Sequence, residues 1–398
     1  MNSAPDAVVV GGGTVGGWAA VMLAEAGRSV VLLEAATLGS GASSRAAGMV
    51  RAQGGTEAAI RLGMFSRDFY QGQRERYPLD SGFVAQGYLM PCFTADEFVA
   101  ARERVTLQRS LGLDVELLDA EELDQRHTGL APGVALGASY APGDGYLDAP
   151  RNVLAYTAAL LDRGVDIREH CRFGGLCFDD DGAVNGVRTS DGDLATRAVV
   201  LTGGPDLAAV GQLAGGRIHA GGTRHQAVVT SPVPGVDLHA LPMVFDVSSG
   251  IYWRPGEYGG LLWGMSNPDE PPGPARDFDA DYFAAMRARV EQLFPAARGL
   301  AVRRSWAATI DYTPDHLPII GPLLRDGTPV HGTVIASAAG HGMMWGPGVA
   351  RAAADLVLTG STELLDVSQL GLDRFDTDGR SRLAADPIAL PFPQRTCP

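Results

Sequence analysis

The stretch Gly11–Gly16 (GGGTVG) stands between a short apolar run at 7–10 (AVVV) and a segment at 14–27 that is rich in small and apolar residues. The apolar run predicts a buried parallel strand, and the segment after the glycines predicts a helix that stops at Gly27. A second apolar run, Val30–Leu33 (VVLL), predicts another strand. Strand, glycine-rich turn, helix and strand together predict the opening βαβ unit of a Rossmann-type fold.

Three glycines of this turn, Gly11, Gly13 and Gly16, occupy the positions of the G-x-G-x-x-G pattern. The first makes a tight turn, the second lets the backbone approach a pyrophosphate, and the third lets the helix pack on the strand. Free amides at the helix start then face the phosphates, aided by the helix dipole. Glu34 follows the second strand, where a carboxylate accepts hydrogen bonds from both hydroxyls of a ribose. Dinucleotide binding is predicted, but this loop does not separate FAD from NAD.

The composition narrows the classes of partner. The 398 residues include 32 basic and 46 acidic side chains, a net charge of −14, with no Lys/Arg-rich run, so nucleic acid is not an expected partner. No segment reaches the ~18 consecutive apolar residues of a membrane-spanning helix. The first residues lack the basic region of a signal peptide, which predicts a cytoplasmic protein. The cysteines form no C-x-x-C pair, which predicts reduced thiols, no metal site and no disulfide reductase.

Four further stretches carry a second pattern. Residues 38–51 (LGSGASSRAAGMVR) offer small residues and hydroxyls for a close approach to an extended cofactor. DGYLD at 144–148 precedes a predicted helix, WAATIDYTPDHLPIIG stands at 306–321, and AGHGMMWGPG stands at 339–348. In this order, the four stretches resemble those of the amine-oxidising flavoproteins of the D-amino acid oxidase superfamily. They are most similar to those of the glycine oxidase and sarcosine oxidase (beta subunit) branch.

The resemblance extends from about residue 6 to residue 360 and implies bound FAD and an enzyme that oxidises an amine or amino acid. The last glycine-rich stretch supports this physically. Glycines bring backbone N–H groups close to a ring, and a helix predicted at 347–359 would direct its positive end at the N1/C2=O edge of a reduced flavin.

The fold predicted from these features is an α/β protein, in which a Rossmann-type FAD-binding domain is interleaved with a β-rich substrate domain of α+β type. Nucleotide-binding stretches lie at both ends of the chain, and strand-forming residues dominate 219–265, so the chain is expected to cross between the domains several times. The predicted FAD-binding domain comprises 1–80, 140–218 and 315–380, and the predicted substrate domain comprises 81–139 and 219–314.

The residues expected to contact FAD lie in these loops and in the turn after the strand near 195–201. They are Gly11, Gly13, Thr14, Val15, Gly16, Glu34, Ala35, Ser43, Ser44, Arg45, Ala47, Gly48, Met49, Gly203, Gly340, His341, Gly342, Met343 and Met344. Family members with covalent flavin carry a cysteine where this chain has Ala308, or a histidine in the loop that here holds Ser43, Ser44 and Arg45. The resemblance therefore implies non-covalent FAD.

Several substrate-facing positions depart from the family pattern. Leu262 stands where monomeric sarcosine oxidases carry a lysine that promotes reaction with oxygen. Ile310 replaces the carboxylate-binding arginine of glycine oxidases, and Met344 replaces a lysine of sarcosine oxidases. Two candidate cations remain: Arg51, which matches a carboxylate-binding arginine of sarcosine oxidases, and Arg254 on a predicted strand. Each could instead form a structural ion pair, and the substrate would then be an amine without a carboxylate.

The candidate catalytic residues are these two arginines together with His341, His225 and Tyr252, and His316 ranks last among the polar contacts. For His341 the alternative is a packed or capping histidine. The expected reaction is transfer of a hydride from the α-carbon of a neutral amine to flavin N5, which gives an imine that water hydrolyses. The electron acceptor is O2 or another molecule, with an oxidase favoured over a dehydrogenase.

Two other classes of function stay open at this level. An NAD-dependent dehydrogenase would share the first glycine loop. A non-catalytic flavin-binding subunit of a multi-subunit amine dehydrogenase would share both loops. The sequence leaves the substrate, its stereochemistry, and the presence of an oligomer or a partner subunit undecided.

Overall fold

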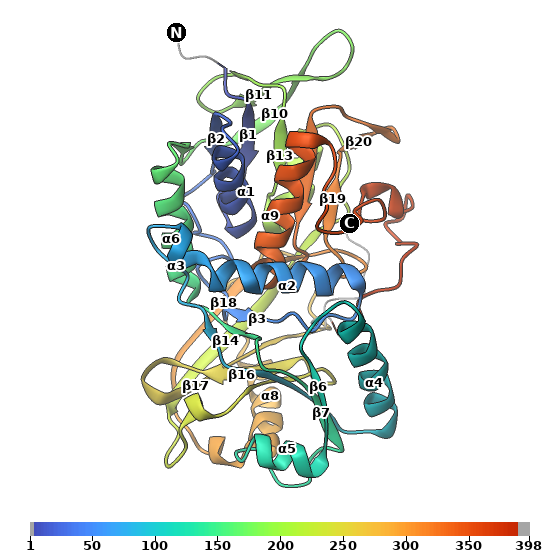
Figure 1. The fold of residues 1–398 in the computed structure, drawn as a ribbon. Helices are drawn as coiled ribbons and strands as arrows, with labels where there is room; N and C mark the ends of the chain where they lie inside the picture. Colours follow the sequence, from blue (N-terminus) through green and yellow to red (C-terminus); the bar gives the residue numbers. More distant parts are fainter. Residues whose placement is uncertain (1–3, 389–398) are drawn as a thin grey trace.

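The computed structural model describes residues 4–388. Its upper half in Figure 1 is built on a six-stranded sheet in the order β19-β22-β13-β1-β2-β9. All neighbouring pairs in this sheet are parallel except β19 with β22. The strands are β1 (Ala7–Val10), β2 (Val30–Leu33), β9 (Asp166–Arg168), β13 (Val199–Leu201), β19 (Ile319–Gly321) and β22 (Thr333–Ser337).

Both faces of this sheet are covered, which explains why its first two strands are continuous apolar runs. Val9 and Leu32 face a core that contains α1 (Thr14–Glu25), α6 (Ala149–Asp162) and α9 (Gly342–Thr359). Their neighbours Val8 and Val31 face the opposite core. That second core is covered by α7 (Leu207–Leu213) and the small sheet of β10 (Phe173–Phe178), β11 (Val184–Thr189) and β12 (Leu194–Ala195).

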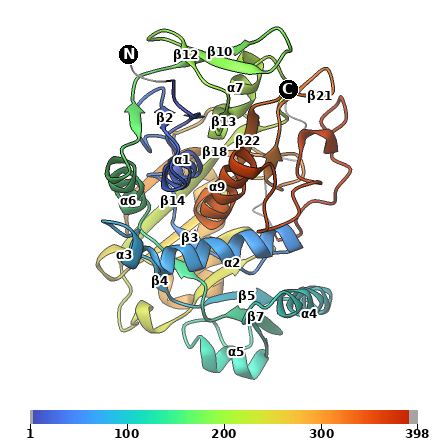
Figure 2. The same cartoon turned by 45° about the horizontal axis from the view of Figure 1, so that its top comes forward.

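The lower half is built on an eight-stranded, mainly antiparallel sheet in the order β18-β14-β17-β16-β15-β5-β7-β6. Figures 1 and 2 show α4 (Ala95–Ser110) and α5 (Ala120–Arg126) at this end of the molecule, and Figure 1 shows α8 (Ala280–Leu293) there too. The strands are β5 (Tyr88–Cys92), β6 (Glu116–Asp119), β7 (Gly137–Ala141), β14 (Gly221–Pro232), β15 (Met243–Asp246), β16 (Ile251–Pro255), β17 (Gly260–Ser266) and β18 (Val302–Tyr312).

The alternation of side chains along these strands separates an outer core from an inner face. Trp253 packs with Phe294 in the outer core, whereas its neighbour Tyr252 lies in a different cluster with Phe245 and Met49. Because side chains alternate between the faces of a strand, Tyr252 points toward the other half of the molecule. The inner face of the eight-stranded sheet therefore carries the side chains that can meet a ligand bound to the first sheet.

Short elements join the two halves. In Figure 1, α2 (Glu57–Gln71) lies across the boundary between them, followed by α3 (Gln73–Arg76). The small sheet β3-β8-β4 is made by β3 (Met49–Val50), β8 (Gly145–Tyr146) and β4 (Val84–Ala85), and β20 (Leu324–Arg325) pairs with β21 (Thr328–Pro329). The predicted fold class, two interleaved units of these types, is confirmed. The exact domain boundaries stay a prediction, and β7 runs across the one at 139/140.

One predicted helix begins at the wrong residue. The expected start was Pro347, because proline is favoured in the first turn of a helix. Instead α9 begins at Gly342, directly after a turn in which Ala339 and Gly340 have positive φ angles of 47° and 82°. The amide of Trp345 donates to the His341 carbonyl at 2.7 Å, and Pro347 lies inside the helix. The positive end of α9 is therefore at His341–Gly342, and the helix begins five residues earlier than predicted.

The segment after α9 returns across the fold and is fixed by a buried ion pair. The Arg374 guanidinium donates from Nε and Nη2 to the two carboxylate oxygens of Asp315, at 2.7 and 3.0 Å. Arg374 also donates to the carbonyls of Leu370 and Leu317. Burial alone would raise the pKa of Asp315, but the hydrogen bonds and charge of Arg374 outweigh burial and hold that pKa below its usual value. The ion pair ties the C-terminal segment to the loop that carries the TPD motif.

We expect Arg374→Met to lower the free energy of unfolding by about 3–5 kcal/mol, because it leaves the Asp315 charge buried without a partner. Urea denaturation of the purified protein measures this change. The control is Arg382→Met, whose ion pair with Asp373 has side chains 56% and 57% exposed. This control should cost less than about 1 kcal/mol. Equal losses in the two variants would contradict the prediction.

Candidate active site

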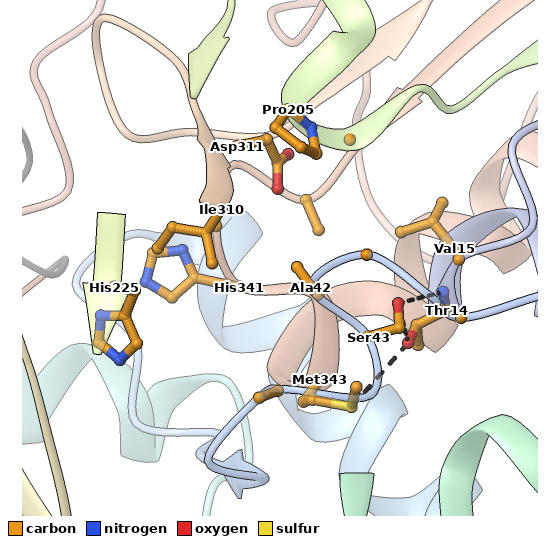
Figure 3. Close-up of a pocket in the computed structure, with 18 of the residues that line it drawn as sticks. Thr14, Val15, Ala42, Ser43, Pro205, His225, Ile310, Asp311, His341 and Met343 are labelled. Carbon is orange, nitrogen blue, oxygen red and sulfur yellow. Dashed lines mark hydrogen bonds between the residues drawn. The ribbon is translucent and has the colours of Figure 1, made fainter. Parts of the chain in front are cut away.

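A cavity of about 420 Å³ is lined by residues from both large sheets. This volume lies in the usual range of cofactor and small-molecule sites. On one side the cavity opens at the carboxyl ends of β1, β2, β13 and β22, which is where open parallel sheets bind ligands. Figure 3 shows Thr14, Val15 and Ser43 on one side of the view and His225 and His341 on the other.

The glycine turn has the geometry that its pattern predicts. Gly11 has a φ angle of +103°, which side-chain-bearing residues rarely adopt. A Cβ added at Gly16 would lie 1.9 Å from the carbonyl oxygen of Gly11. The third glycine therefore allows α1 to start directly against the end of β1, with the first turn of the helix at the cavity wall.

The amides of this turn are less free than expected. The Gly12 amide donates to Glu34 Oε2 at 2.8 Å, and the Thr14 amide donates to the Ser43 hydroxyl at 2.9 Å. Glu34 Oε1 accepts from the Ala36 amide at 2.8 Å. The expectation that the amides at the helix start all face a ligand is thus corrected for Gly12 and Thr14. In return, the Glu34 carboxylate is held at the cavity edge in one orientation.

The second loop, 38–51, is held in place from the other sheet. The Trp306 indole donates to the Arg45 carbonyl at 2.7 Å, and Arg254 Nε donates to the Ala47 carbonyl at 2.7 Å. The Arg45 guanidinium folds back onto the Gly41 carbonyl at 2.8 Å. The tryptophan of the 306–321 motif therefore fixes the loop that lines the cavity, although it is far from that loop in the sequence.

Most of the residues predicted to contact the cofactor line the cavity. They are Gly11, Gly13, Thr14, Val15, Glu34, Ala35, Ser43, Ala47, Gly48, Met49, Gly203, Gly340, His341, Gly342, Met343 and Met344. Gly16, Ser44 and Arg45 do not belong to the lining. Gly16 is pressed against Gly11, and Ser44 and Arg45 bond within their own loop, so these three shape the wall rather than form it.

Sequence reasoning missed other lining residues. One group follows the carboxyl ends of two parallel strands: Thr202, Gly204, Pro205 and Asp206 after β13, and Ser337 and Ala338 at β22. The strand-end rule for open α/β sheets would have found this group. A second group, which includes Tyr88, Phe245 and Asp311, comes from the eight-stranded sheet. Its aromatic members have no sequence signal, because they stand in apolar strands that read as core.

Three residues of the eight-stranded sheet form a hydrogen-bonded chain at the far end of the cavity. His225 Nδ1 lies 2.6 Å from the Ser266 hydroxyl, and His225 Nε2 bonds to the Tyr252 hydroxyl. The register pairs His225 with Ser266 across β14 and β17, and Gly264 leaves room for the Tyr252 ring. His225 and Tyr252, both predicted site residues, line the cavity, and Ser266 lies behind them. Ser266 was not predicted.

These groups are uncharged. Burial lowers the pKa of His225 to about 4, and burial raises the pKa of Tyr252. The imidazole and the phenol are therefore both neutral near pH 7. A neutral pair can donate and accept hydrogen bonds without adding a charge to the cavity of the resting protein.

His341 both packs and lines the cavity, so the two readings made from the sequence coexist. Its ring lies 4.1 Å from that of Trp345, and Nδ1 lies 2.9 Å from the Ala339 carbonyl oxygen. Burial lowers the pKa of His341 to about 3, with a further contribution from the charge of Arg51. His341 is the N-cap residue of α9, and its imidazole is neutral.

Of the two candidate cations, only Arg51 lines the cavity within the described residues. It is 4% exposed, and its Cζ lies 5.2 Å from the centre of the Phe245 ring. Its Nη atoms donate to the backbone carbonyls of Gln53 and Ile388. No carboxylate of residues 4–388 forms an ion pair with it, so the alternative of a structural ion pair is not found.

Arg254 is placed differently. It bonds to the Ala47 carbonyl and its Cζ lies 4.5 Å from the centre of the Tyr146 ring, outside the cavity lining. His316 is buried beside Asp315 and is also absent from the lining. The structure therefore places Arg254 as a support of the 38–51 loop, and it does not bring His316 to the site.

The DGYLD motif supports the site without lining it. Asp144 is fully buried and accepts from the Ala52 amide at 2.9 Å, next to Arg51. Burial raises the pKa of Asp144, and the hydrogen bond from Ala52 opposes that shift. Asp148 caps α6 by accepting from the Arg151 amide at 2.7 Å.

Comparison with known proteins agrees with this geometry. The profile of the DAO family, described as FAD dependent oxidoreductase, matches residues 6–356. The chain belongs to the DAO family of FAD-dependent oxidoreductases. This finding confirms the resemblance identified from the motifs, and it makes FAD the cofactor and the chain an enzyme of that class.

Two relatives illustrate the match within the DAO family. The chain is 30% identical over 397 residues to a 4-methylaminobutanoate oxidase (formaldehyde-forming) of Paenarthrobacter nicotinovorans, covering 94% of this chain and 46% of that protein. It is 29% identical to a glycine oxidase of Geobacillus kaustophilus, covering 81% of this chain and 85% of the relative. The chain thus spans about half the length of the first relative.

Solved structures of the same family share the fold. L-proline dehydrogenase from P. horikoshii superposes with a TM-score of 0.86 at 26% identity, covering 94% of this chain and 98% of that one. The Geobacillus kaustophilus glycine oxidase gives a TM-score of 0.80 at 27% identity, covering 94% and 99%. Among residues 4–388, no helix is both long enough and apolar enough to cross a membrane.

The site fits FAD on its own features. Glu34 is oriented at the ribose end, the glycine turn and Ser43 line the middle, and the start of α9 meets the cavity beside His341. Glu34 can bind ribose hydroxyls, and the positive end of α9 can stabilise negative charge on a flavin ring.

We expect the free energy of unfolding to fall as the pH drops from 6.5 toward 4. The pKa of His225 is lowered from 6.5 to about 4, so in that window the unfolded chain takes up a proton that the folded chain does not. The contribution of His225 to the free energy of unfolding is fully present above pH 6.5. It is lost as the pH falls toward 4, by up to about 1.4 kcal/mol per pH unit. Urea denaturation of His225→Gln should give a shallower pH slope than the wild type. The exposed His239→Gln variant is the control, and a wild-type slope in His225→Gln would refute the assignment.

Proposed function

We propose that this chain catalyses FAD-dependent oxidation of the C–N bond of an amine or amino acid that carries a carboxylate. The observation that carries the proposal is one wall of the cavity. There the neutral His225–Tyr252 pair stands in the same lining as Arg51, which lies over Phe245. Phe245 and Tyr252 belong to one apolar cluster, so these groups are close neighbours.

When bound, FAD supplies the redox step by accepting a hydride at N5 from the α-carbon of the substrate, whose imine is then hydrolysed by water. The protein has to hold that C–H within about 3–3.5 Å of the acceptor atom. Apolar side chains, among them Met49, Phe245, Ile310 and Met343, line the cavity and exclude water from the reacting atoms. Ala308 is buried and its methyl side chain is no nucleophile, which supports non-covalent FAD.

The cavity favours the reactive, neutral form of the amine. The burial that lowers the pKa of His225 to about 4 also disfavours an ammonium group in the same place. Tyr252 can exchange a hydrogen bond with the amine nitrogen, and His225, backed by Ser266, can take up or return the proton through the Tyr252 hydroxyl. This chain of groups gives the amine proton a path that does not need a permanently charged base.

Arg51 defines the other end of the substrate. A buried guanidinium without an ion-pair partner is a strong site for a carboxylate. The compounds named for the relatives, 4-methylaminobutanoate, glycine and L-proline, are all amines that carry a carboxylate. Of the two candidate arginines, Arg51 is therefore the one that we propose to bind the substrate carboxylate. Ile310 and Met344, where relatives have cationic side chains, contribute apolar surface instead.

The electron acceptor is proposed as O2, with another acceptor as the alternative. Leu262, at the position of the oxygen-promoting lysine, is buried in the apolar cluster behind the cavity wall and adds no charge there. Membership of a family of FAD-dependent oxidoreductases argues against the alternative of an NAD-dependent dehydrogenase. A non-catalytic flavin-binding subunit remains an outcome of the experiment that follows.

We expect amines with a carboxylate to bleach the visible absorption band of the flavin under anaerobic conditions. The screen uses N-methyl amino acids, cyclic imino acids, D-amino acids and simple amines, and readmission of air tests oxygen as acceptor. Arg51→Ala should weaken the carboxylate substrates about tenfold to a hundredfold while neutral amines change little. No bleaching by any compound would support the non-catalytic subunit. An equal loss for both substrate classes would remove Arg51 from its role.

Tyr252→Phe should slow anaerobic flavin reduction by about 10²–10³-fold, because it removes the hydroxyl that connects His225 to the amine. Stopped-flow absorbance at saturating substrate measures the rate. The matched control is Tyr258→Phe, at a side chain that is 83% exposed, which should reduce its flavin at the wild-type rate. A Tyr252→Phe variant as fast as the control would exclude the proton path.

A further inference from the structure

The C-terminal segment returns to the wall of the active site. After the Arg374–Asp315 ion pair, the Arg382 amide donates to the Arg374 carbonyl at 2.9 Å and the chain continues to Ile388. Ile388 is 0% exposed and belongs to the same apolar cluster as Tyr252 and Phe245. A segment remote from the glycine loops thus brings Ile388 into contact with the side chains at the substrate end of the cavity.

Its point of contact is Arg51. The Ile388 carbonyl accepts from Arg51 Nη2 at 3.1 Å, and the Gln53 carbonyl accepts from Nη1 at 2.6 Å. Arg51 Nε is buried and has no hydrogen-bond partner within the described residues. Backbone carbonyls therefore fix the two Nη nitrogens of a guanidinium that belongs to a residue of the cavity lining.

The chemistry of these two acceptors matters. A carboxylate in place of either carbonyl would neutralise the guanidinium and compete with an anionic ligand. A backbone carbonyl orients the guanidinium but leaves its full positive charge available. The C-terminal segment therefore orients Arg51 without neutralising its charge, which an ion pair could not do at this position.

The segment is seated in a groove that requires a glycine. The Ile388 amide donates to Asp386 Oδ1 at 3.0 Å, and Asp386 is 5% exposed. A Cβ added at Gly55 would lie 2.3 Å from Asp386 Oδ1 and 2.6 Å from Pro387 Cδ. The backbone of Gly55 has no positive φ angle and does not itself require a glycine. A side chain is excluded here because Asp386 and Pro387 occupy the space.

We infer that residues 381–388, which we name the C-terminal strap, are a positioning element of the active site that presents Arg51 to the carboxylate of the substrate. The inference rests on the proposed function only in taking Arg51 as the carboxylate-binding residue. Loosening the strap should reduce affinity for carboxylates selectively, because Arg51 loses one of its two fixed acceptors. FAD binding should be unaffected, because no strap residue lines the cavity.

The test uses acetate and its neutral isostere acetamide, titrated into the oxidised holoenzyme and followed by flavin absorbance and by calorimetry. Gly55→Ala displaces the strap at Asp386 and Pro387, and Ile388→Ala removes its apolar contact. Each should weaken acetate binding about tenfold and leave acetamide unchanged, since the loss concerns one charge-assisted interaction. Gly72→Ala, at an exposed helix end where a Cβ meets only ordinary contacts, should match the wild type.

Three results would overturn the inference: acetate that does not bind to the wild type, variants that bind acetate as the wild type does, and equal losses for acetate and acetamide. The last result would mean general damage to the site rather than a role through Arg51. Flavin content checks that each variant is folded, and Ile388→Ala provides the test if Gly55→Ala loses FAD. Because acetate binding needs no turnover, a failure of the proposed oxidation would show separately, as a flavin that binds acetate but is not bleached by amines.

Discussion

The cofactor half of the molecule depends on one close contact, in which Gly16 approaches the carbonyl oxygen of Gly11 so closely that a Cβ would lie 1.9 Å from it. This contact sets where α1 begins relative to β1. The positions of Thr14, Val15 and the Glu34 carboxylate follow from it, since Glu34 accepts from Gly12 within the same turn. A side chain at Gly16 would move the helix off the strand end and would displace the wall that the FAD phosphates must meet.

The substrate half depends on the burial of two neutral histidines, His225 and His341, beside the charged Arg51. Burial lowers the pKa values of His225 and His341 to about 4 and about 3, so the cavity holds neutral imidazoles. Backbone carbonyls rather than carboxylates hold Arg51, so within the described residues no ion pair compensates its positive charge. The positive charge of Arg51 beside the neutral His225 and Tyr252 suits a molecule that is anionic at one end and a neutral amine at the other.

Long-range contacts join the two halves into one site. Trp306 and Arg254 reach from the eight-stranded sheet to the carbonyls of the 38–51 loop. The Arg374–Asp315 ion pair fixes the segment that reaches Arg51. The family motifs in this chain are therefore partly supports: their residues hold the loops that line the cavity, and many do not line it themselves.

The sequence by itself determined the Rossmann unit, because the glycine pattern, the apolar runs and Glu34 act over short distances along the chain. The motifs at both ends of the chain indicated the interleaved fold class, and their resemblance to a known family indicated FAD and most of the cofactor wall. It also named His225, Tyr252, His341 and Arg51. Only the tertiary structure decided which cation faces the cavity, that Ser266 backs His225, that α9 starts at Gly342, and that Ile388 meets Arg51. These facts depend on strand register and on contacts between residues hundreds of positions apart, which no local pattern of residue types records.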